Sequence, residues 1–278
     1  MSGTNAPLSD RALPADIDTT KASIARAYDA ALGGKDNYEV DREVVRQLQQ
    51  VAPEITQYAW DNRHFLIRVT RFLASEAGIT QFLDCGSGLP TAENTHQVAQ
   101  RIQPEARVVY VDNDPVVLAH GRALLEENDQ THFSAADIFK PREILDDEIV
   151  RKHLDVAEPI ALFQISTLHH YDGERSLADI MQEYIDRLPS GSYVAISHFF
   201  DPENEYSELA RRIEQVFLHS PLGSGWFRTR AEIERMLPGL ELIEPGLTLC
   251  ADWWPGGPRI KPLAPEQHCL VGAVGRKP

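Results

Sequence analysis

The chain has 278 residues, of which 42% are hydrophobic and 25% charged, so it is long enough for one large domain of globular composition. Its formal net charge of −15 argues against a nucleic-acid partner, because phosphate binding requires a basic face. No apolar run approaches the roughly 20 residues of a membrane span, and no signal peptide opens the sequence, so we expect no membrane partner. Cys85, Cys250 and Cys269 show neither paired nor metal-type spacing, which favours a cytoplasmic protein without a metal site.

The N-terminal part of the sequence predicts helices and no strand. Residues 1–15 are polar and contain prolines, which is typical of a flexible tail. Apolar residues at helical spacing predict three helices, within 21–32, 40–48 and 54–77. Residues 16–79 are therefore expected to form a helical layer packed on a core of residues 80–278. The turn between the first two helices, residues 33–37, is either a plain connection or part of a lid over the functional site.

From residue 81 onward, short apolar runs alternate with helical patterns. The expected strands are 81–84, 107–111, 131–135, 159–165, 192–199, 240–244 and 268–275. The expected helices are 91–103, 115–127, 141–153, 175–188, 203–218 and 229–236. Such alternation predicts a parallel sheet covered on both faces. A Pro/Gly-rich loop replaces the helix before the last strand, so the fold class is α/β, a doubly wound, Rossmann-like sheet of seven strands with an antiparallel last strand.

A glycine-rich turn follows the first of these strands. Asp84 stands at the strand end, Gly86-Ser87-Gly88 forms a tight turn, and Pro90 is expected to open a helix. The free N–H groups at a helix N-terminus and the close backbone approach that glycine permits are typical of a nucleotide-type binding site. A dinucleotide fingerprint would have a third glycine at position 91, where this chain has Thr91.

Carboxylates end three successive predicted strands, at Asp84, Asp112 and Asp137. Because the carboxyl ends of parallel strands meet at one edge of the sheet, these groups are expected to converge where ligands bind in such folds. Acidic groups beside a compact glycine turn suit a cationic nucleoside better than a pyrophosphate. This favours S-adenosylmethionine over a nicotinamide dinucleotide.

Three segments carry a resemblance to a known family: 84–91 with Asn94-Thr95-His96, 23–38, and 110–115. They are similar to an actinobacterial family of S-adenosylmethionine-dependent methyltransferases that is largely uncharacterised. The resemblance runs from about residue 16 to the C-terminus. It implies a class I methyltransferase fold, with S-adenosylmethionine as cofactor and S-adenosylhomocysteine as product. Pro90 stands where many members of the superfamily have a third glycine, which we interpret as a feature of this subfamily.

The class I fold assigns expected roles around the glycine turn. Asp84 is expected to order the turn and to contact the methionine moiety, directly or through water. The backbone of Gly86, Ser87 and Gly88 is expected to pass close under the cofactor. Asp112 is expected to accept hydrogen bonds from both ribose hydroxyls.

Further residues are expected around the adenine and across from it. Asn113 is expected beside the adenine ring, Asp137 at its amino group and Ile138 packed on the ring. Gln164, at the end of the fourth strand, is also expected at the cofactor. Three residues of the helical layer are candidates for contacts with the cofactor or the acceptor: Tyr28, Asn37 and Arg63.

The segment after the fourth strand faces the methyl group in this fold, and here it contains His169-His170. It lacks the Asn-Pro-Pro-Tyr motif of some amino methyltransferases and is closer to the Leu-His segment of small-molecule O-methyltransferases. Since histidine has a suitable intrinsic pKa, His169 is the candidate general base, ahead of His170. The alternative is that this histidine only caps a helix or packs against the sheet. Trp253-Trp254 has two interpretations: such aromatics more often belong to the core, and beside a proline-rich loop they could form the wall of an apolar acceptor cavity.

The sequence thus predicts an S-adenosylmethionine-dependent methyltransferase that acts on a small molecule, at oxygen or nitrogen, by in-line displacement. Two alternatives stay open. One is a protein that binds S-adenosylmethionine or S-adenosylhomocysteine without catalysis, and the other is an NAD(P)-dependent oxidoreductase. Both a monomer and a homodimer are compatible with the sequence.

Overall fold

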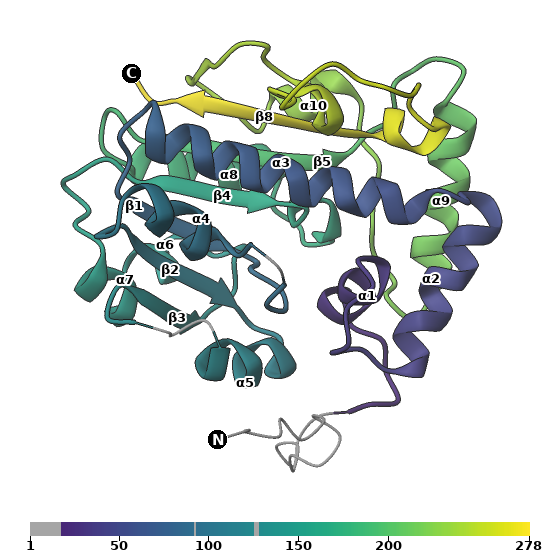
Figure 1. Cartoon of the computed structure of the whole chain (residues 1–278), viewed down its shortest axis with the longest axis horizontal. Helices are drawn as coiled ribbons and strands as arrows, with labels where there is room; N and C mark the ends of the chain where they lie inside the picture. The colour runs from purple at the N-terminus through teal and green to yellow at the C-terminus, as the bar shows by residue number, and fades with distance from the viewer. Residues whose placement is uncertain (1–17, 92, 125–127) are drawn as a thin grey trace.

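The computed structural model describes residues 18–91, 93–124 and 128–278 (Figure 1). The predicted tail of residues 1–15 lies outside this part of the chain. Within it, no helix has both the length and the apolar character needed to cross a lipid bilayer.

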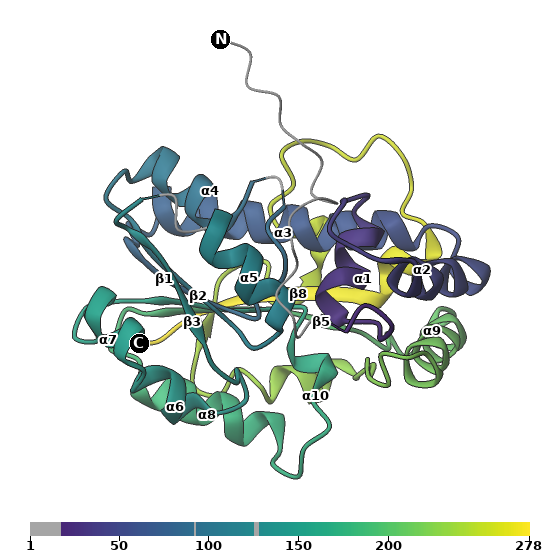
Figure 2. The same ribbon diagram turned by 90° about the horizontal axis from the view of Figure 1, so that it is seen from below.

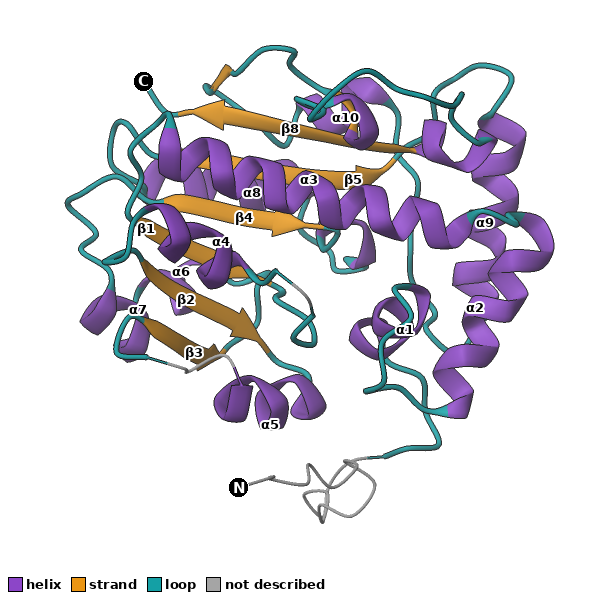
Figure 3. Cartoon of the chain, in the orientation of Figure 1, coloured by secondary structure: helices purple, strands orange, loops and turns teal. Residues whose placement is uncertain are grey.

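A single mixed sheet forms the centre of the fold, and it confirms the expected α/β class. Strands β1 to β5 are parallel and β8 is antiparallel to β5, as Figure 3 shows. The strand order places β1 beside both β2 and β4, so the chain reverses its direction of travel across the sheet between β1 and β4. Ligands in open α/β sheets bind at the carboxyl ends of the strands flanking such a switch point. In spatial order the strands are β3 (Thr131–Ala135), β2 (Arg107–Asp112), β1 (Gln81–Cys85), β4 (Ala161–Ile165), β5 (Tyr193–Phe199), β8 (Leu270–Arg276) and β6 (Glu241–Leu242), with β7 (Thr248–Leu249) also pairing with β8.

Helices cover both faces of the sheet (Figure 2). Strands β1 and β4 are buried at every position, as expected for strands with helices on both sides. One face packs against α3 (Ile55–Ser75), α4 (Thr95–Ile102) and α5 (Pro115–Leu124). The other packs against α6 (Pro141–Leu145), α7 (Glu148–His153), α8 (Leu177–Arg187) and α10 (Arg230–Glu234).

The N-terminal helices α1 (Ile24–Ala31) and α2 (Glu39–Val51) stand at the carboxyl edge of the sheet, next to α9 (Ser207–His219) (Figure 1). A buried ion pair joins the first two helices: Arg26 Nε lies 2.9 Å from Asp41 Oδ2. Asp41 also accepts hydrogen bonds from the backbone N–H groups of Ser23 (3.0 Å) and Tyr38 (2.9 Å). One carboxylate therefore joins the N-terminal ends of α1 and α2.

Several boundaries differ from the sequence prediction. Helix α4 begins at Thr95 and not at Pro90, because Asn94 and Gln97 form a capping box at its start. The helix expected over 141–153 is two short helices, since Asp147 accepts hydrogen bonds from the N–H groups of the second one. The strand expected over 240–244 is the two-residue β6, and the equally short β7 adds an eighth strand.

Trp253 packs in the core and Trp254 packs on it, the commoner role of such aromatics, and the two do not form a wall of an acceptor cavity. The Trp253 ring packs edge-on against Phe65 and Phe72 of α3, with centroids 5.6 and 5.8 Å apart, and the Trp254 ring stacks on Trp253. Neither tryptophan lines the cavity described below. Their apolar area stabilises the contact between α3 and the C-terminal loop instead.

Candidate functional site

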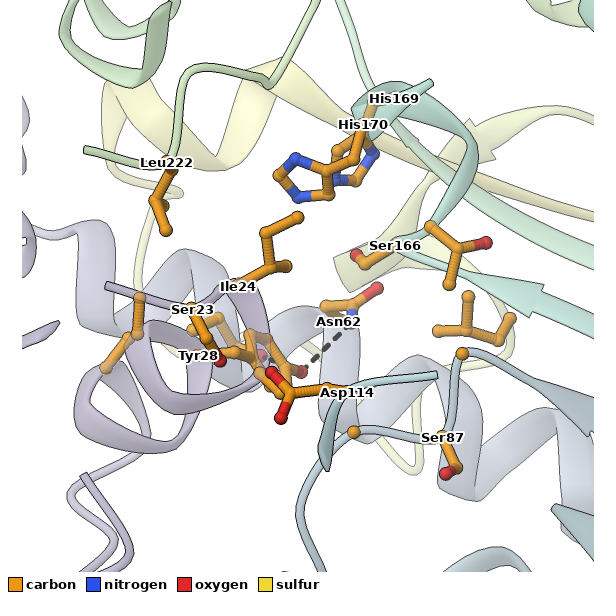
Figure 4. A pocket seen from close by; sticks show the side chains of 18 of the residues that line it. Ser23, Ile24, Tyr28, Asn62, Ser87, Asp114, Ser166, His169, His170 and Leu222 are labelled. Atoms are coloured by element: carbon orange, nitrogen blue, oxygen red, sulfur yellow. Dashed lines mark hydrogen bonds between the residues drawn. The ribbon is translucent and has the colours of Figure 1, made fainter. Parts of the chain in front are cut away.

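A cavity of ≈ 450 Å³ opens at the carboxyl edge of the sheet, between the strand ends and the N-terminal helices. One wall comes from the segments that follow β1, β2, β3 and β4, and the facing wall from α1, α2 and α3. Figure 4 shows Ser87 and Asp114 on one side of it and the two histidines after β4 on the other, with Ser166 between them in this view. The volume lies within the range of about 300–1,000 Å³ common for small-molecule sites.

The glycine turn after β1 forms the floor of this cavity. Gly86 (φ +75°) and Gly88 (φ +62°) both adopt the left-handed conformation that other residues rarely take. A Cβ added at Gly86 would stand 2.3 Å from Thr167 Cγ2, whereas one added at Gly88 would meet no atom of the described residues within 4 Å. The Ser87 hydroxyl is buried and has no hydrogen-bond partner among the described residues. The backbone of the turn is thus packed against Thr167 at Gly86, whereas it faces open space at Gly88.

Asp112 ties the end of β2 to this turn. Its Oδ2 accepts from the Gly88 N–H at 2.9 Å, and its Oδ1 accepts from the Asp114 N–H at 3.0 Å. Burial raises the pKa of Asp112, and these backbone donors counteract the rise. Each carboxylate oxygen can accept further hydrogen bonds from a ligand, because each has more than one acceptor direction.

Asp84 is the most deeply buried carboxylate of the cavity, with 4% of its surface exposed. Its Oδ2 accepts from Thr95 Oγ1 at 2.6 Å. Burial raises the pKa of Asp84 to about 6, against the opposing effects of the Thr95 hydrogen bond and of Arg63. The Arg63 guanidinium lies nearby and donates to the Glu93 carbonyl at 3.0 Å, which attaches α3 to the loop after the glycine turn.

The segment after β3 completes the acidic edge. Asp137 Oδ1 accepts from the Phe139 N–H at 3.0 Å, so the carboxylate shapes its own turn. The carbonyl of Ile138 accepts from Tyr184 Oη at 2.8 Å. The three carboxylates predicted to converge therefore line one cavity. The structure places these predicted residues in its lining: Tyr28, Arg63, Asp84, Gly86, Ser87, Gly88, Asp112, Asn113, Asp137, Ile138 and His169.

Two predicted site residues do not line the cavity. Asn37 Nδ2 donates to Asp29 Oδ2 at 2.7 Å and holds the turn between α1 and α2 in shape. Gln164 is fully buried, and its Oε1 accepts from Thr167 Oγ1 at 2.6 Å, behind the cavity wall. Both side chains support segments that reach the cavity, and neither reaches it.

A hydrogen-bonded chain that the sequence did not reveal crosses from β5 to α1. Ser197 Oγ donates to Asn62 Oδ1 at 2.5 Å, Asn62 Nδ2 donates to Tyr28 Oη at 2.9 Å, and Tyr28 Oη donates to the Ala59 carbonyl at 3.2 Å (Figure 4 draws the middle contact). Ser166, whose N–H donates to Ser197 Oγ at 2.9 Å, has φ +58°. A non-glycine residue in this conformation is strained, and such strain concentrates at functional sites.

His169 and His170 follow β4 in a 3₁₀ turn, η2 (Leu168–His170), and both line the cavity. The His169 ring stacks on Phe199 with centroids 3.5 Å apart, and its Nδ1 accepts from the Phe199 N–H at 3.4 Å. His170 Nδ1 lies 2.9 Å from Ser224 Oγ. Burial lowers the pKa of both rings, so both are neutral near pH 7.

Among the described residues, no group of three or more histidine, cysteine, aspartate or glutamate side chains is arranged to hold a metal ion. The polar side chains of the cavity lining carry carboxylates, hydroxyls, amides, imidazoles and the Arg63 guanidinium.

Comparisons with known proteins agree on one family. A model of the S-adenosyl methyltransferase family matches residues 10–278. A proposed methyltransferase from Thermobifida fusca YX is 42% identical, covers 95% of this chain and 98% of its own, and superposes with a TM-score of 0.89. A DUF574 family protein from Streptomyces avermitilis MA-4680 is 38% identical, over 94% and 99% of the two chains, with a TM-score of 0.88.

More distant solved structures share only the fold. An S-adenosylmethionine-dependent methyltransferase from Anabaena variabilis is 15% identical, over 93% of this chain and 97% of its own, with a TM-score of 0.50. None of the curated proteins matches this chain.

Proposed function

The chain belongs to the S-adenosyl methyltransferase family, whose cofactor is S-adenosylmethionine, and we propose that its cavity is the site of methyl transfer to a small molecule. The acceptor atom is an oxygen or a nitrogen. The observation that carries this proposal is that one cavity joins two unlike walls, an acidic sheet edge and an apolar helical layer.

The sheet edge suits the cofactor. Gly88 leaves open space where a Cβ would stand, so the backbone of the turn can approach a ligand closely. The Asp112 carboxylate is already oriented by two backbone N–H groups and retains acceptor capacity for a pair of ribose hydroxyls. Asp84 and Asp137 add negative charge, which suits a sulfonium and an ammonium group.

The helical wall suits an acceptor of low polarity. The charged residues of the cavity lining are Arg63 and four aspartates, and all four aspartates belong to the sheet edge. Arg63, on α3, already donates to the Glu93 carbonyl, and a charged acceptor elsewhere along the helical wall would lose its hydration without gaining a charged partner, which is unfavourable. Apolar side chains come from all three helices, among them Ile24 and Ala27, Val45 and Leu48, and Ile55 and Leu66.

When bound, S-adenosylmethionine supplies an electrophilic methyl group on a sulfonium. The residues of this chain contribute alignment and exclusion of water, the main requirements of an in-line displacement. The apolar helices bury the acceptor and remove water from its nucleophilic atom. The polar chain of Tyr28, Asn62 and Ser197 holds α1 and α3 against β5, so the two walls keep a fixed separation.

The test is isothermal titration with S-adenosylmethionine, S-adenosylhomocysteine and NAD. We expect micromolar binding of both adenosyl ligands and no binding of NAD. Replacing Asp112 by alanine is expected to weaken the binding of both adenosyl ligands by about 1–3 kcal/mol, the loss typical of charge-assisted hydrogen bonds. Asp137→Asn serves as the milder control, since the amide keeps an acceptor oxygen. Failure of the wild-type protein to bind either adenosyl ligand would sink the proposal.

A further inference from the structure

Three histidines meet at the part of the cavity wall that follows β4, where His169 and His170 line the cavity and His198 lies behind them. The ring centroids of His169 and His170 are 4.5 Å apart, and those of His169 and His198 are 5.3 Å apart. His169 and His198 are both at most 1% exposed, whereas His170 is partly exposed. Each ring has a different set of hydrogen-bond partners, and these partners decide which ring can hold a second proton.

His169 and His198 are held in the neutral form by donors. His169 Nδ1 accepts from the Phe199 N–H at 3.4 Å, so the single proton of its ring belongs on Nε2. His198 has the reverse tautomer, because its Nδ1 donates to the Phe199 carbonyl at 2.6 Å and its Nε2 accepts from Arg228 Nη1 at 3.0 Å. A second proton on either ring would face another N–H donor, and at His198 this donor carries a full positive charge.

His170 has a partner of a different kind. Its Nδ1 lies 2.9 Å from Ser224 Oγ, and a hydroxyl oxygen can accept a hydrogen bond as well as donate one. The Nε2 atom has no hydrogen-bond partner among the described residues, and the ring lines the cavity. Of the three rings, His170 therefore has an acceptor for Nδ1–H in its protonated form and a second nitrogen available to a ligand.

We propose that His170 is the proton acceptor of this site, with Ser224 as its positioning residue, and that the methyl acceptor is a neutral, largely apolar molecule bearing a hydroxyl group. This inference rests on the proposed methyl transfer. It replaces His169, the histidine that the sequence alone favours, by its neighbour. It also chooses oxygen over nitrogen, because a neutral amine needs no base in the displacement whereas a hydroxyl is helped by one.

The hydroxyl oxygen of the acceptor forms a bond to the methyl carbon, and the bond from that carbon to sulfur breaks with its electron pair going to sulfur. The O–H bond breaks, its electron pair stays on oxygen, and the proton passes to His170 Nε2. In the resulting imidazolium, Nδ1–H donates to Ser224 Oγ. Burial lowers the pKa of His170 to about 4, so the ring releases this proton to water at neutral pH.

The first experiment reads the tautomers of the three rings at neutral pH, by long-range proton–nitrogen NMR of the ¹⁵N-histidine protein with and without S-adenosylhomocysteine. We expect the Nδ1–H tautomer at His170 and the Nε2–H tautomer at His169. His170→Gln assigns the resonances by removing one set. Ser224→Ala is expected to shift His170 toward the Nε2–H tautomer, while Ser224→Thr, which keeps the hydroxyl, is expected to leave it unchanged. An Nε2–H tautomer at His170 in the wild-type protein would overturn the proposal.

The second experiment adds 1-naphthol, a neutral apolar probe with one hydroxyl, to the complex with S-adenosylhomocysteine. We expect naphthol to shift the Nε2 resonance of His170 more than the resonances of His169 and His198, and the shifted resonance to be missing from the spectrum of His170→Gln. Absence of any shift at millimolar naphthol would overturn the choice of a hydroxyl acceptor. Failure of S-adenosylhomocysteine to bind is a separate outcome: it would refute the proposed function, whereas the tautomers of the free protein still decide between His170 and His169.

Discussion

The two walls of the cavity are built in different ways. At the sheet edge, backbone N–H groups and carboxylates close to each other in the sequence bond to one another, as in the contacts of Asp112 with Gly88 and Asp114. In the helical layer, apolar side chains face the cavity, and a buried ion pair between Arg26 and Asp41 joins α1 to α2. The first wall depends on strand ends that the whole core holds in place. In the second wall, α2 and α3 pack into the same hydrophobic core as the strands, and α1 is attached through the Arg26–Asp41 pair and the hydrogen bond between Tyr28 and Asn62.

Because of this difference, we expect the helical wall to tolerate substitution better than the sheet edge does. The sheet edge must present the same hydrogen-bond acceptors to one cofactor, so its geometry is determined by local turns. The helical layer needs only to be apolar and to close, so its shape can follow the acceptor. We expect the two walls to respond differently to substitution, and the following changes test this, starting from the largest expected effect.

Asp41→Ala should produce the largest difference in stability between the two walls. It leaves the Arg26 guanidinium buried without its partner, which typically costs about 3–5 kcal/mol. By hydrogen–deuterium exchange, we expect α1 and α2 to lose protection while β1, β2 and β4 keep theirs. The double variant Arg26→Met/Asp41→Leu should recover much of the loss, since a well-packed apolar pair can replace a buried ion pair. Equal loss of protection in helices and sheet would show that the two walls unfold as one unit.

Asp84→Asn should stabilise the fold, in contrast to the destabilising Asp41→Ala. Burial raises the pKa of Asp84 to about 6 from the ordinary 3.8, so the folded protein binds this proton more tightly than the unfolded chain. The stability contributed by the protonated form is full below about pH 4 and is lost as the pH rises through about 6. Asparagine keeps an acceptor for Thr95 without the charge, so the free energy of unfolding at pH 7 should rise by about 2–3 kcal/mol.

Urea unfolding without ligand at pH 4 and pH 7 checks this prediction. The free energy of unfolding of Asp84→Asn should exceed that of the wild type mainly at pH 7. The affinity of the variant for S-adenosylmethionine should fall. Together these results would show that the sheet edge keeps a charge at a cost in stability because the cofactor needs it. A variant that is less stable than the wild type at pH 7 would contradict the assignment.

The sequence predicted the sheet edge better than the helical wall, for physical reasons. Asp84, Asp112 and Asp137 could be brought together because the carboxyl ends of parallel strands must meet at one edge. The start of α4 was readable as well, since Asn94 and Gln97 form a capping pair, but the proline at position 90 suggested an earlier start.

Contacts between segments that are distant in the sequence could not be predicted from local patterns. Asn62 and Ser197 are 135 positions apart, and His170 meets Ser224 across 54 positions, so no local pattern announces either pair. The left-handed Ser166 is also invisible in a sequence, because the strain is imposed by its neighbours. Strands β6 and β7 have only two residues each, too few to show an alternating pattern.

Asn37→Ala should have the smallest effect on stability, and it tests whether the helical layer contacts the cofactor. Asn37 lies in the turn that resembles the family signature, yet its amide donates to Asp29 and to the Gly34 carbonyl instead of lining the cavity. Losing these hydrogen bonds should lower the free energy of unfolding by about 0.5–1.5 kcal/mol and leave the affinity for S-adenosylhomocysteine unchanged. Asn62→Ala is the matched control, because the same amide is removed from a residue that does line the cavity. If calorimetry instead found weaker cofactor binding in Asn37→Ala, the turn would have to close over the ligand, and the helical layer would bind the cofactor as well as the acceptor.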